Sequence, residues 1–233
     1  MHLLKFIDTI EGLNEVFNKD IPKGSVVLIT GEPGSLKSGL VYSIMAGYLN
    51  GCGEIGSYIT LEQNKDNHLK NMKSMGIELS EQLFIFDYTD CRLQSDAYSR
   101  DILSLIENSI IQQKIEHGDR FSCLALDSLG ALYSLMDNDP KLMRKRLYHI
   151  LEPLRRQNLT TFLILETAGS TGSEVDFEGY LADGIIELGF HTKDETSKRY
   201  LKVKKMRSSA HSMEPHALTV SKTGLQIYKS TIF

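Results

Sequence analysis

The stretch Gly31-Glu32-Pro33-Gly34-Ser35-Leu36-Lys37-Ser38 decides the fold of this chain. It follows Ser25–Thr30, a β-branched and almost continuously apolar segment that predicts a buried strand. It also opens a segment, ending at about Asn50, that is typical of a helix. A glycine-bearing turn from a strand into a helix is the setting of a Walker A loop, which wraps the phosphates of a nucleotide.

The predicted role of each loop residue follows from phosphate chemistry. Gly31 and Gly34 allow backbone conformations and close approaches that a side chain would prevent. The N–H groups of the loop and the dipole of the following helix favour a bound anion. Lys37 is predicted to neutralise the β- and γ-phosphates, and Ser38 to offer its hydroxyl to Mg²⁺. We expect the nucleotide to be bound by Gly31, Glu32, Pro33, Gly34, Ser35, Leu36, Lys37, Ser38 and Gly39.

Leu36 departs from the Walker A pattern, because it stands where the second glycine is expected. If this residue has already entered the helix, a right-handed backbone is open to leucine, and the main cost is room for its side chain. The alternative is a strand-to-helix turn that binds no phosphate.

The remaining apolar pattern predicts an α/β fold with a mainly parallel sheet and helices on both faces. Further buried strands are expected at Gly56–Leu61, Leu83–Asp87, Phe121–Leu126 and Thr160–Leu165. Tyr98–His117 and Pro140–Gln157 carry apolar residues at helical spacing. After about Gly179 the pattern changes to short strands joined by polar turns, which predicts a C-terminal antiparallel β-meander that extends the sheet. These strands are expected at Gly184–Phe190, Arg199–Met206, Ala217–Val220 and Leu225–Tyr228. We expect a single domain spanning residues 1–233.

Composition narrows the class of protein. The chain has 26 basic and 30 acidic side chains in 233 residues, so no global charge attracts nucleic acid or an anionic membrane. Its apolar segments are far shorter than a membrane span, and its first residues do not resemble a secretory signal. The three cysteines, Cys52, Cys91 and Cys123, are too far apart to suggest a zinc site or disulfide framework. We expect a cytoplasmic protein with no membrane partner.

Carboxylates at the ends of other predicted strands complete a candidate site. Asp127 follows Phe121–Leu126, as a Walker B aspartate would, and is the candidate partner of Mg²⁺ together with Ser38. Taken alone, such an aspartate is as readily a helix cap. Glu62 follows another strand and is the candidate that directs the attacking water, with Gln63 helping to position it.

Two more features bear on the nucleotide. Glu166 ends Thr161–Leu165 and is a second carboxylate at the same edge, interpreted as a sensor of the phosphate state or as a solvated loop carboxylate. The segment Asn64-Lys65-Asp66-Asn67 lacks the Asn-Lys-x-Asp spacing of a guanine-binding motif, which favours ATP over GTP.

These motifs, in this order, resemble the KaiC-like branch of the RecA/DnaB superfamily, in particular its single-domain archaeal members. Besides the Walker A loop, the resemblance rests on six segments. These are Thr9–Glu15, Ile21–Ser25, Ile59–Gln63, Leu126–Leu129, Ala182–Gly184 and Lys204–Arg207. It implies a RecA-like P-loop core that binds Mg-ATP between the subunits of a ring, often a hexamer. The family usually has two adjacent glutamates where this chain has Glu62 and Gln63, which implies slow turnover or a switch dominated by binding.

The resemblance also assigns residues to the neighbouring subunit. It implies that Lys205 and Arg207 reach the neighbour's γ-phosphate as trans-acting fingers. Without the family, these residues with Lys202 and Lys204 are an exposed basic strand. In the family the 168–174 loop lies near the ring channel, but here it has no Lys or Arg, which argues against contact with DNA. A cationic helix face carries Lys141, Arg144, Lys145, Arg146, Arg155 and Arg156; we interpret it as solvated or facing a subunit rather than as a nucleic-acid patch.

Three hypotheses result. The first is an oligomeric regulatory ATPase of low turnover, with a regulatory protein as partner. The second is a nucleotide-gated binding module without significant hydrolysis. The third is a recombinase-like DNA-binding ATPase, for which the sequence offers no support of its own.

Overall fold

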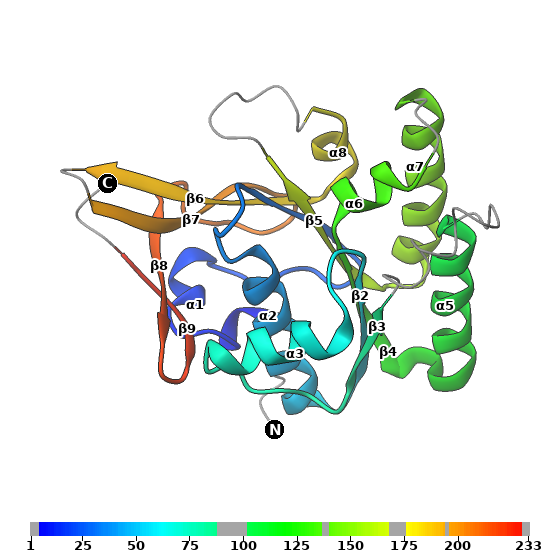
Figure 1. Cartoon of the computed structure of the whole chain (residues 1–233), viewed down its shortest axis with the longest axis horizontal. Helices are drawn as coiled ribbons and strands as arrows, with labels where there is room; N and C mark the ends of the chain where they lie inside the picture. Colours follow the sequence, from blue (N-terminus) through cyan, green and yellow to red (C-terminus); the bar gives the residue numbers. More distant parts are fainter. Residues whose placement is uncertain (1–4, 88–101, 137–139, 168–175, 194–195, 230–233) are drawn as a thin grey trace.

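The fold is described from a computed structural model, in residues 5–87, 102–136, 140–167, 176–193 and 196–229. Within these residues, nine strands form one sheet in the order β3-β2-β4-β5-β1-β6-β7-β8-β9 (Figure 1). The strands are β1 (Val26–Gly31), β2 (Ile55–Thr60), β3 (Leu83–Asp87), β4 (Phe121–Asp127), β5 (Thr160–Glu166), β6 (Gly184–Lys193), β7 (Thr196–Met206), β8 (His216–Ser221) and β9 (Gly224–Lys229). The predicted α/β class with a parallel core and an antiparallel C-terminal extension is confirmed.

The first strand of the predicted meander has two roles. β6 pairs in parallel with β1 along Val27–Gly31 and antiparallel with β7, so it closes the parallel core and starts the antiparallel part. β6 and β7 are also longer than predicted, because their hairpin continues through residues of the expected polar turn. Polar side chains there do not end the strands, since the hairpin satisfies the backbone groups of both.

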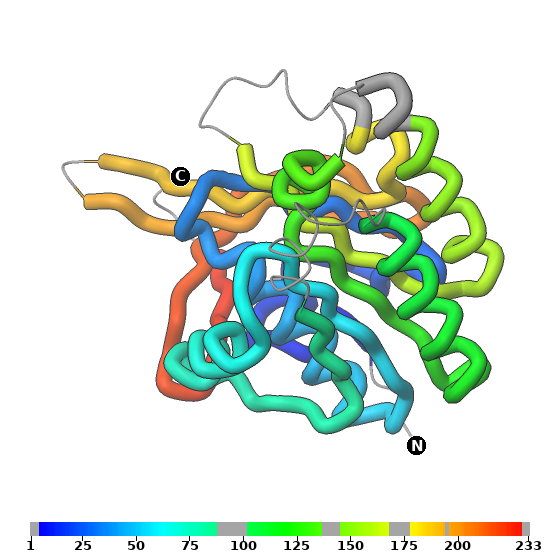
Figure 2. Tube along the Cα trace, turned by 45° about the vertical axis from the view of Figure 1, so that its right-hand side comes forward, coloured from blue at the N-terminus to red at the C-terminus, as the bar shows by residue number. Residues whose placement is uncertain are grey.

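Helices cover both faces of the sheet (Figure 2). They are α1 (Leu13–Val16), α2 (Lys37–Cys52), α3 (Lys65–Ser74), α5 (Ile102–His117), α6 (Leu129–Ser134), α7 (Pro140–Arg156) and α8 (Asp176–Leu181), with short 3-10 turns η1 (Phe6–Asp8) and η2 (Gly118–Arg120). On one face, α5 and α7 lie side by side (Figures 1 and 2), and their buried leucines and isoleucines share a core cluster with residues of the strands. None of the helices in the described part of the chain has the length and hydropathy that a bilayer crossing requires.

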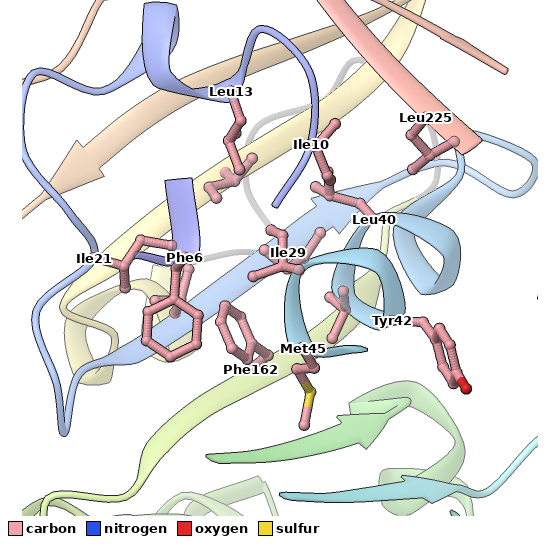
Figure 3. Close-up of a cluster of buried hydrophobic side chains, with 14 of the residues drawn as sticks. Phe6, Ile10, Leu13, Ile21, Ile29, Leu40, Tyr42, Met45, Phe162 and Leu225 are labelled. Atoms are coloured by element: carbon pink, nitrogen blue, oxygen red, sulfur yellow. The ribbon is translucent and has the colours of Figure 1, made fainter. Parts of the chain in front are cut away.

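The larger core lies on the opposite face, around α2. Leu40, Tyr42 and Met45 of this helix belong to one buried cluster with Ile29 of β1 and Phe162 of β5, and Figure 3 shows the Tyr42 ring pointing away from Ile29 and Phe162. The N-terminal segment and the C-terminal hairpin close the same cluster, which brings together residues far apart in the sequence. Since α2 is buried along most of its length, the loop before it is attached to a well-packed helix.

Strand register sets which residues can share an edge. Gly31 lies opposite Glu166, and Asp127 lies opposite Thr60 and Ile164. The carboxyl ends of β1, β2, β4 and β5 therefore meet at one edge of the sheet, where α/β proteins bind ligands. β6 begins at the opposite edge, and Met206 of β7 lies opposite Gly184 there.

Helix α3 was not predicted, because its sequence is strongly polar. His68 and Met72 are its buried residues, too few to give a clear apolar stripe. Its start is fixed instead by Asn64, whose side chain accepts a hydrogen bond from the Asn67 N–H at 2.9 Å. The segment that only looks like a guanine-binding motif is thus a helix cap.

Candidate functional site

The loop between β1 and α2 has the backbone of a phosphate cradle. Gly31 has φ of 153° and Gly34 has φ of 80°, a region that side chains disfavour. A Cβ atom on Gly31 would lie 2.2 Å from the Leu188 carbonyl oxygen and 2.8 Å from Ser35 Oγ. The close contacts therefore require glycine at position 31, and the positive φ favours glycine at position 34, as the sequence predicted.

The expectation for Leu36 is wrong. Leu36 has not entered the helix: it is the N-cap of α2 and has left-handed φ and ψ of 76° and 26°. This is the conformation that the second glycine of the pattern would adopt without strain, and leucine adopts it at a cost. Its side chain is partly buried against the core around α2, which compensates part of that cost.

Lys37 lies beneath the loop and is only 6% exposed. Its ammonium group donates to the Glu32 carbonyl oxygen at 3.0 Å and lies 3.4 Å from Glu166 Oε1. The cation is thus enclosed by the loop, and the carboxylate that forms an ion pair with it in the described part of the chain comes from the end of the neighbouring strand β5. Glu166 itself is 44% exposed, so a phosphate that approaches the loop can replace it.

Asp127 forms a buried oxygen cluster at the end of β4. Its Oδ2 accepts a hydrogen bond from the Tyr58 hydroxyl at 2.7 Å, and Ser38 also interacts with the carboxylate. Burial raises the pKa of Asp127, and the hydrogen bonds from Tyr58 and Ser38 oppose that rise. Asp127 and Ser38, predicted as partners, are therefore adjacent.

Glu62 lies just beyond β2 at the same edge. Ser128, the N-cap of α6, donates a short hydrogen bond to its Oε1. Partial burial raises the pKa of Glu62, and the charges of Asp127 and Glu166 add to the rise. Gln63 is not directed to this site, because its Oε1 accepts a hydrogen bond from Asn71 Nδ2 of α3 at 2.9 Å.

The residues present fit a magnesium nucleotide. Ser35 Oγ is buried in the loop and has no hydrogen-bond partner among the described residues, so a donor faces the cradle unpaired. Hydroxyl and carboxylate oxygens, such as those of Ser38 and Asp127, are the ligands that Mg²⁺ prefers.

Lys205 and Arg207 lie away from this edge. Lys205 Nζ donates to the carbonyl oxygens of Gly179 and Ala182 at 2.9 and 2.7 Å, and burial lowers its pKa. Arg207 forms an ion pair with Asp183 at 3.1 Å. They lie where β6 begins, at the opposite edge from the Walker A loop, so they do not reach the site of their own chain.

The basic patches of the sequence are partly neutralised. Lys204 forms an ion pair with Glu187, Arg155 with Asp183 and Arg156 with Glu152. The prediction that β7 is an exposed basic strand is therefore only partly correct, because Lys204 is paired with Glu187. The predicted Gly- and Ser-rich loop at 168–174 and Cys91 lie outside the described residues.

Three residues of the site were missed. Tyr58 bonds Asp127, Ser128 bonds Glu62, and Arg199 of β7 donates to the Gly34 carbonyl oxygen at 2.9 Å. The Arg199 guanidinium also lies 5.3 Å from the centre of the Phe190 ring. A tyrosine in a buried strand was a signal for the first, but nothing local connects Arg199 to a loop 165 residues earlier.

Fold and site together define a RecA-like P-loop nucleotide-binding protein. The family model described as "ATPase: KaiC" matches residues 8–232. The chain belongs to this family of KaiC-like ATPases, and its similarity to single-domain members confirms the predicted resemblance.

Known relatives fall into two groups. UPF0273 proteins of Methanopyrus kandleri and Thermotoga maritima are 28% and 27% identical; the alignments cover 96% and 98% of this chain and 92% and 98% of theirs. The circadian clock oscillator protein KaiC of Synechococcus elongatus is 25% identical over 97% of this chain, which spans only 44% of the longer protein. A crystal structure of a KaiC-like protein from Pyrococcus horikoshii has the same fold, with a TM-score of 0.80, 23% identity and coverage of 97% of this chain and 99% of that one.

Proposed function

We propose that the chain is a Mg-dependent ATP-binding protein that hydrolyses ATP slowly and acts as an oligomeric regulatory ATPase. The observation that carries this proposal is the enclosed Lys37 ammonium beneath the glycine cradle, with the Ser38–Asp127 oxygen pair beside it. A buried lysine whose carboxylate partner, Glu166, is partly exposed to solvent is suited to an anionic ligand.

The proposed reaction is the hydrolysis of the γ-phosphate. Lys37 and the N–H groups of the loop hold the phosphates, and Glu62 accepts a proton from the attacking water. The water oxygen bonds to the γ-phosphorus while the bond to the β–γ bridging oxygen breaks, and ADP leaves with that electron pair. Ser128 keeps the Glu62 carboxylate oriented through its hydrogen bond.

Ser38 and Asp127 would hold Mg²⁺, which supplies charge neutralisation between the β- and γ-phosphate oxygens when it is bound. Both side chains start from rigid elements, the first turn of α2 and the end of β4. That placement favours a preorganised site.

We further propose assembly into a ring, with Lys205 and Arg207 as trans-acting fingers. Their position at the edge opposite the Walker A loop supports this, because a head-to-tail ring brings that edge to a neighbour's site. In such a ring, Lys205 first leaves the carbonyl oxygen of Gly179 in α8, and Arg207 first leaves Asp183.

The second candidate function is a nucleotide-gated binding module with negligible hydrolysis. The position of Gln63 favours it, because Asn71 holds this amide toward α3 and Gln63 therefore does not help Glu62 to position the water. Binding of ATP would then control a protein partner.

Turnover of radiolabelled ATP by the wild type and Glu62→Gln tests the proposal. We expect turnover to fall in the variant by about 100-fold or more, because the proton acceptor is lost, while ATP affinity is kept. Glu78→Gln, an exposed change outside the site, is the control. Equal turnover in wild type and Glu62→Gln would remove Glu62 from the mechanism, and tight binding without turnover would favour the second function.

A further inference from the structure

Tyr58 stands directly behind the candidate metal ligand. It lies on β2 opposite Ala125 of β4, two residues before Asp127. Its ring is fully buried, and its hydroxyl reaches Asp127 Oδ2 at 2.7 Å. The phenol group therefore runs along the sheet toward the edge where the loop lies.

The ring of Tyr58 is held in place by two aromatic neighbours. The centre of the His68 ring lies 4.5 Å away and that of Tyr42 lies 6.0 Å away. All three side chains are buried, so the hydroxyl has little freedom to move. A hydrogen bond from a fixed donor fixes the orientation of its acceptor as well.

The chemistry of a carboxylate explains what this contact does. Asp127 has two oxygens, and one of them is committed to the tyrosine hydroxyl. The other oxygen has no bond to Tyr58 and is the one that could face a cation. Groups that orient metal ligands in this way are known to change metal affinity by about 10- to 100-fold when they are removed.

We propose that Tyr58 is a positioning residue that presents one oxygen of Asp127 to the magnesium ion of bound ATP. The inference rests on the proposed function and adds a residue outside the Walker motifs to it. Phenylalanine at this position would fill the same space but leave the carboxylate free to rotate.

The test compares Tyr58→Phe with Tyr42→Phe. Tyr42→Phe is a matched control, because it removes one hydroxyl from the same buried cluster, and that hydroxyl interacts with the Ser80 backbone rather than with Asp127. Binding of Mn²⁺ to the protein with ATP is followed by the electron paramagnetic resonance signal of free Mn²⁺. Binding of ATP alone is measured in excess EDTA, and thermal unfolding monitors the fold.

We expect Tyr58→Phe to weaken Mn²⁺ binding by about 10-fold while ATP affinity in EDTA stays unchanged, and Tyr42→Phe to alter neither. Unchanged Mn²⁺ affinity in Tyr58→Phe overturns the inference. An equal loss of ATP affinity in EDTA also overturns it, because the residue would then be merely structural. If the wild type binds ATP and Mn²⁺ does not change that binding, only the inference about Tyr58 is overturned. If the wild type binds no ATP, the proposed function is overturned as well.

Discussion

At the residue scale, the loop is held in place by residues that a motif does not describe. Leu36 takes a left-handed backbone at the start of α2, and Arg199 bonds the Gly34 carbonyl oxygen from the far strand β7. The left-handed backbone of Leu36 is strained, and the hydrogen bond from Arg199 restrains the loop. A motif mismatch is therefore tolerated here because packing and a long-range hydrogen bond support the backbone.

Substitution of Leu36 separates strain from packing. Leu36→Ala loses the side-chain contacts and keeps the positive φ, whereas Leu36→Gly loses the same contacts and relieves the strain. We expect the glycine variant to have the larger free energy of unfolding by about 1 kcal/mol, the reverse of the usual order inside a helix. Urea denaturation of both variants measures the difference; an alanine variant as stable as the glycine variant would contradict the assigned backbone.

At the element scale, α3 connects the edge that carries Glu62 and Asp127 to the interior. It starts just after Glu62 and Gln63, and its His68 packs on the ring of Tyr58. Burial among Tyr42 and Tyr58 lowers the pKa of His68 to about 4. The neutral imidazole is thus part of the support behind Asp127.

This burial predicts a loss of stability in acid. In the unfolded chain His68 takes up a proton below a pH of about 6.5, while in the folded chain it does so only near 4, so stability falls as the pH drops through that window. Between pH 7 and pH 5 we expect a loss of about 2 kcal/mol from this residue. In His68→Phe that part of the loss should vanish, as measured by urea denaturation at both pH values. The exposed His149→Gln serves as control; an equal pH dependence in wild type and His68→Phe would contradict the burial.

The sequence predicted those elements whose pattern is local. The β1 strand, the glycine cradle, Lys37 and Asp127 follow from neighbouring residues, and so does the change to antiparallel strands after Gly179. The backbone of Leu36 could not be predicted, because it depends on whether packing compensates for strain. The Tyr58–Asp127 and Arg199–Gly34 contacts join distant parts of the chain, and only the sheet order brings those parts together.

At the scale of the whole molecule, two opposite edges of the sheet carry different groups of charged residues. One edge carries the nucleotide site, and the other carries Lys205, Arg207 and the Asp183 cluster. Hydrogen bonds from the Val26 N–H and Arg155 overcome the effect of burial and lower the pKa of Asp183, so the cluster stays ionised. A ring would join the two edges of neighbouring chains.

Mixing two inactive variants tests that arrangement. Lys37→Ala lacks the loop lysine and Arg207→Ala lacks the finger, so each should lose turnover alone. In an equal mixture, about a quarter of head-to-tail interfaces pair an intact loop with an intact Arg207, and we expect roughly a quarter of wild-type turnover. Arg155→Ala is the control, because it removes another ion-pair partner of Asp183 and leaves Arg207 in place. We expect this variant to keep its turnover. A mixture no more active than its components would contradict the trans-acting finger.

Nucleotide binding at the Walker A loop is the central claim, and equilibrium dialysis with radiolabelled ATP and Mg²⁺ tests it most directly. The account predicts saturable binding to the wild type and a loss of affinity of about 100-fold or more in Lys37→Ala, because the enclosed cation contacts the phosphates. Lys23→Ala, which removes an exposed lysine paired with Glu54, should bind as the wild type does. Absence of binding to the wild type, or equal binding to Lys37→Ala, would contradict the account.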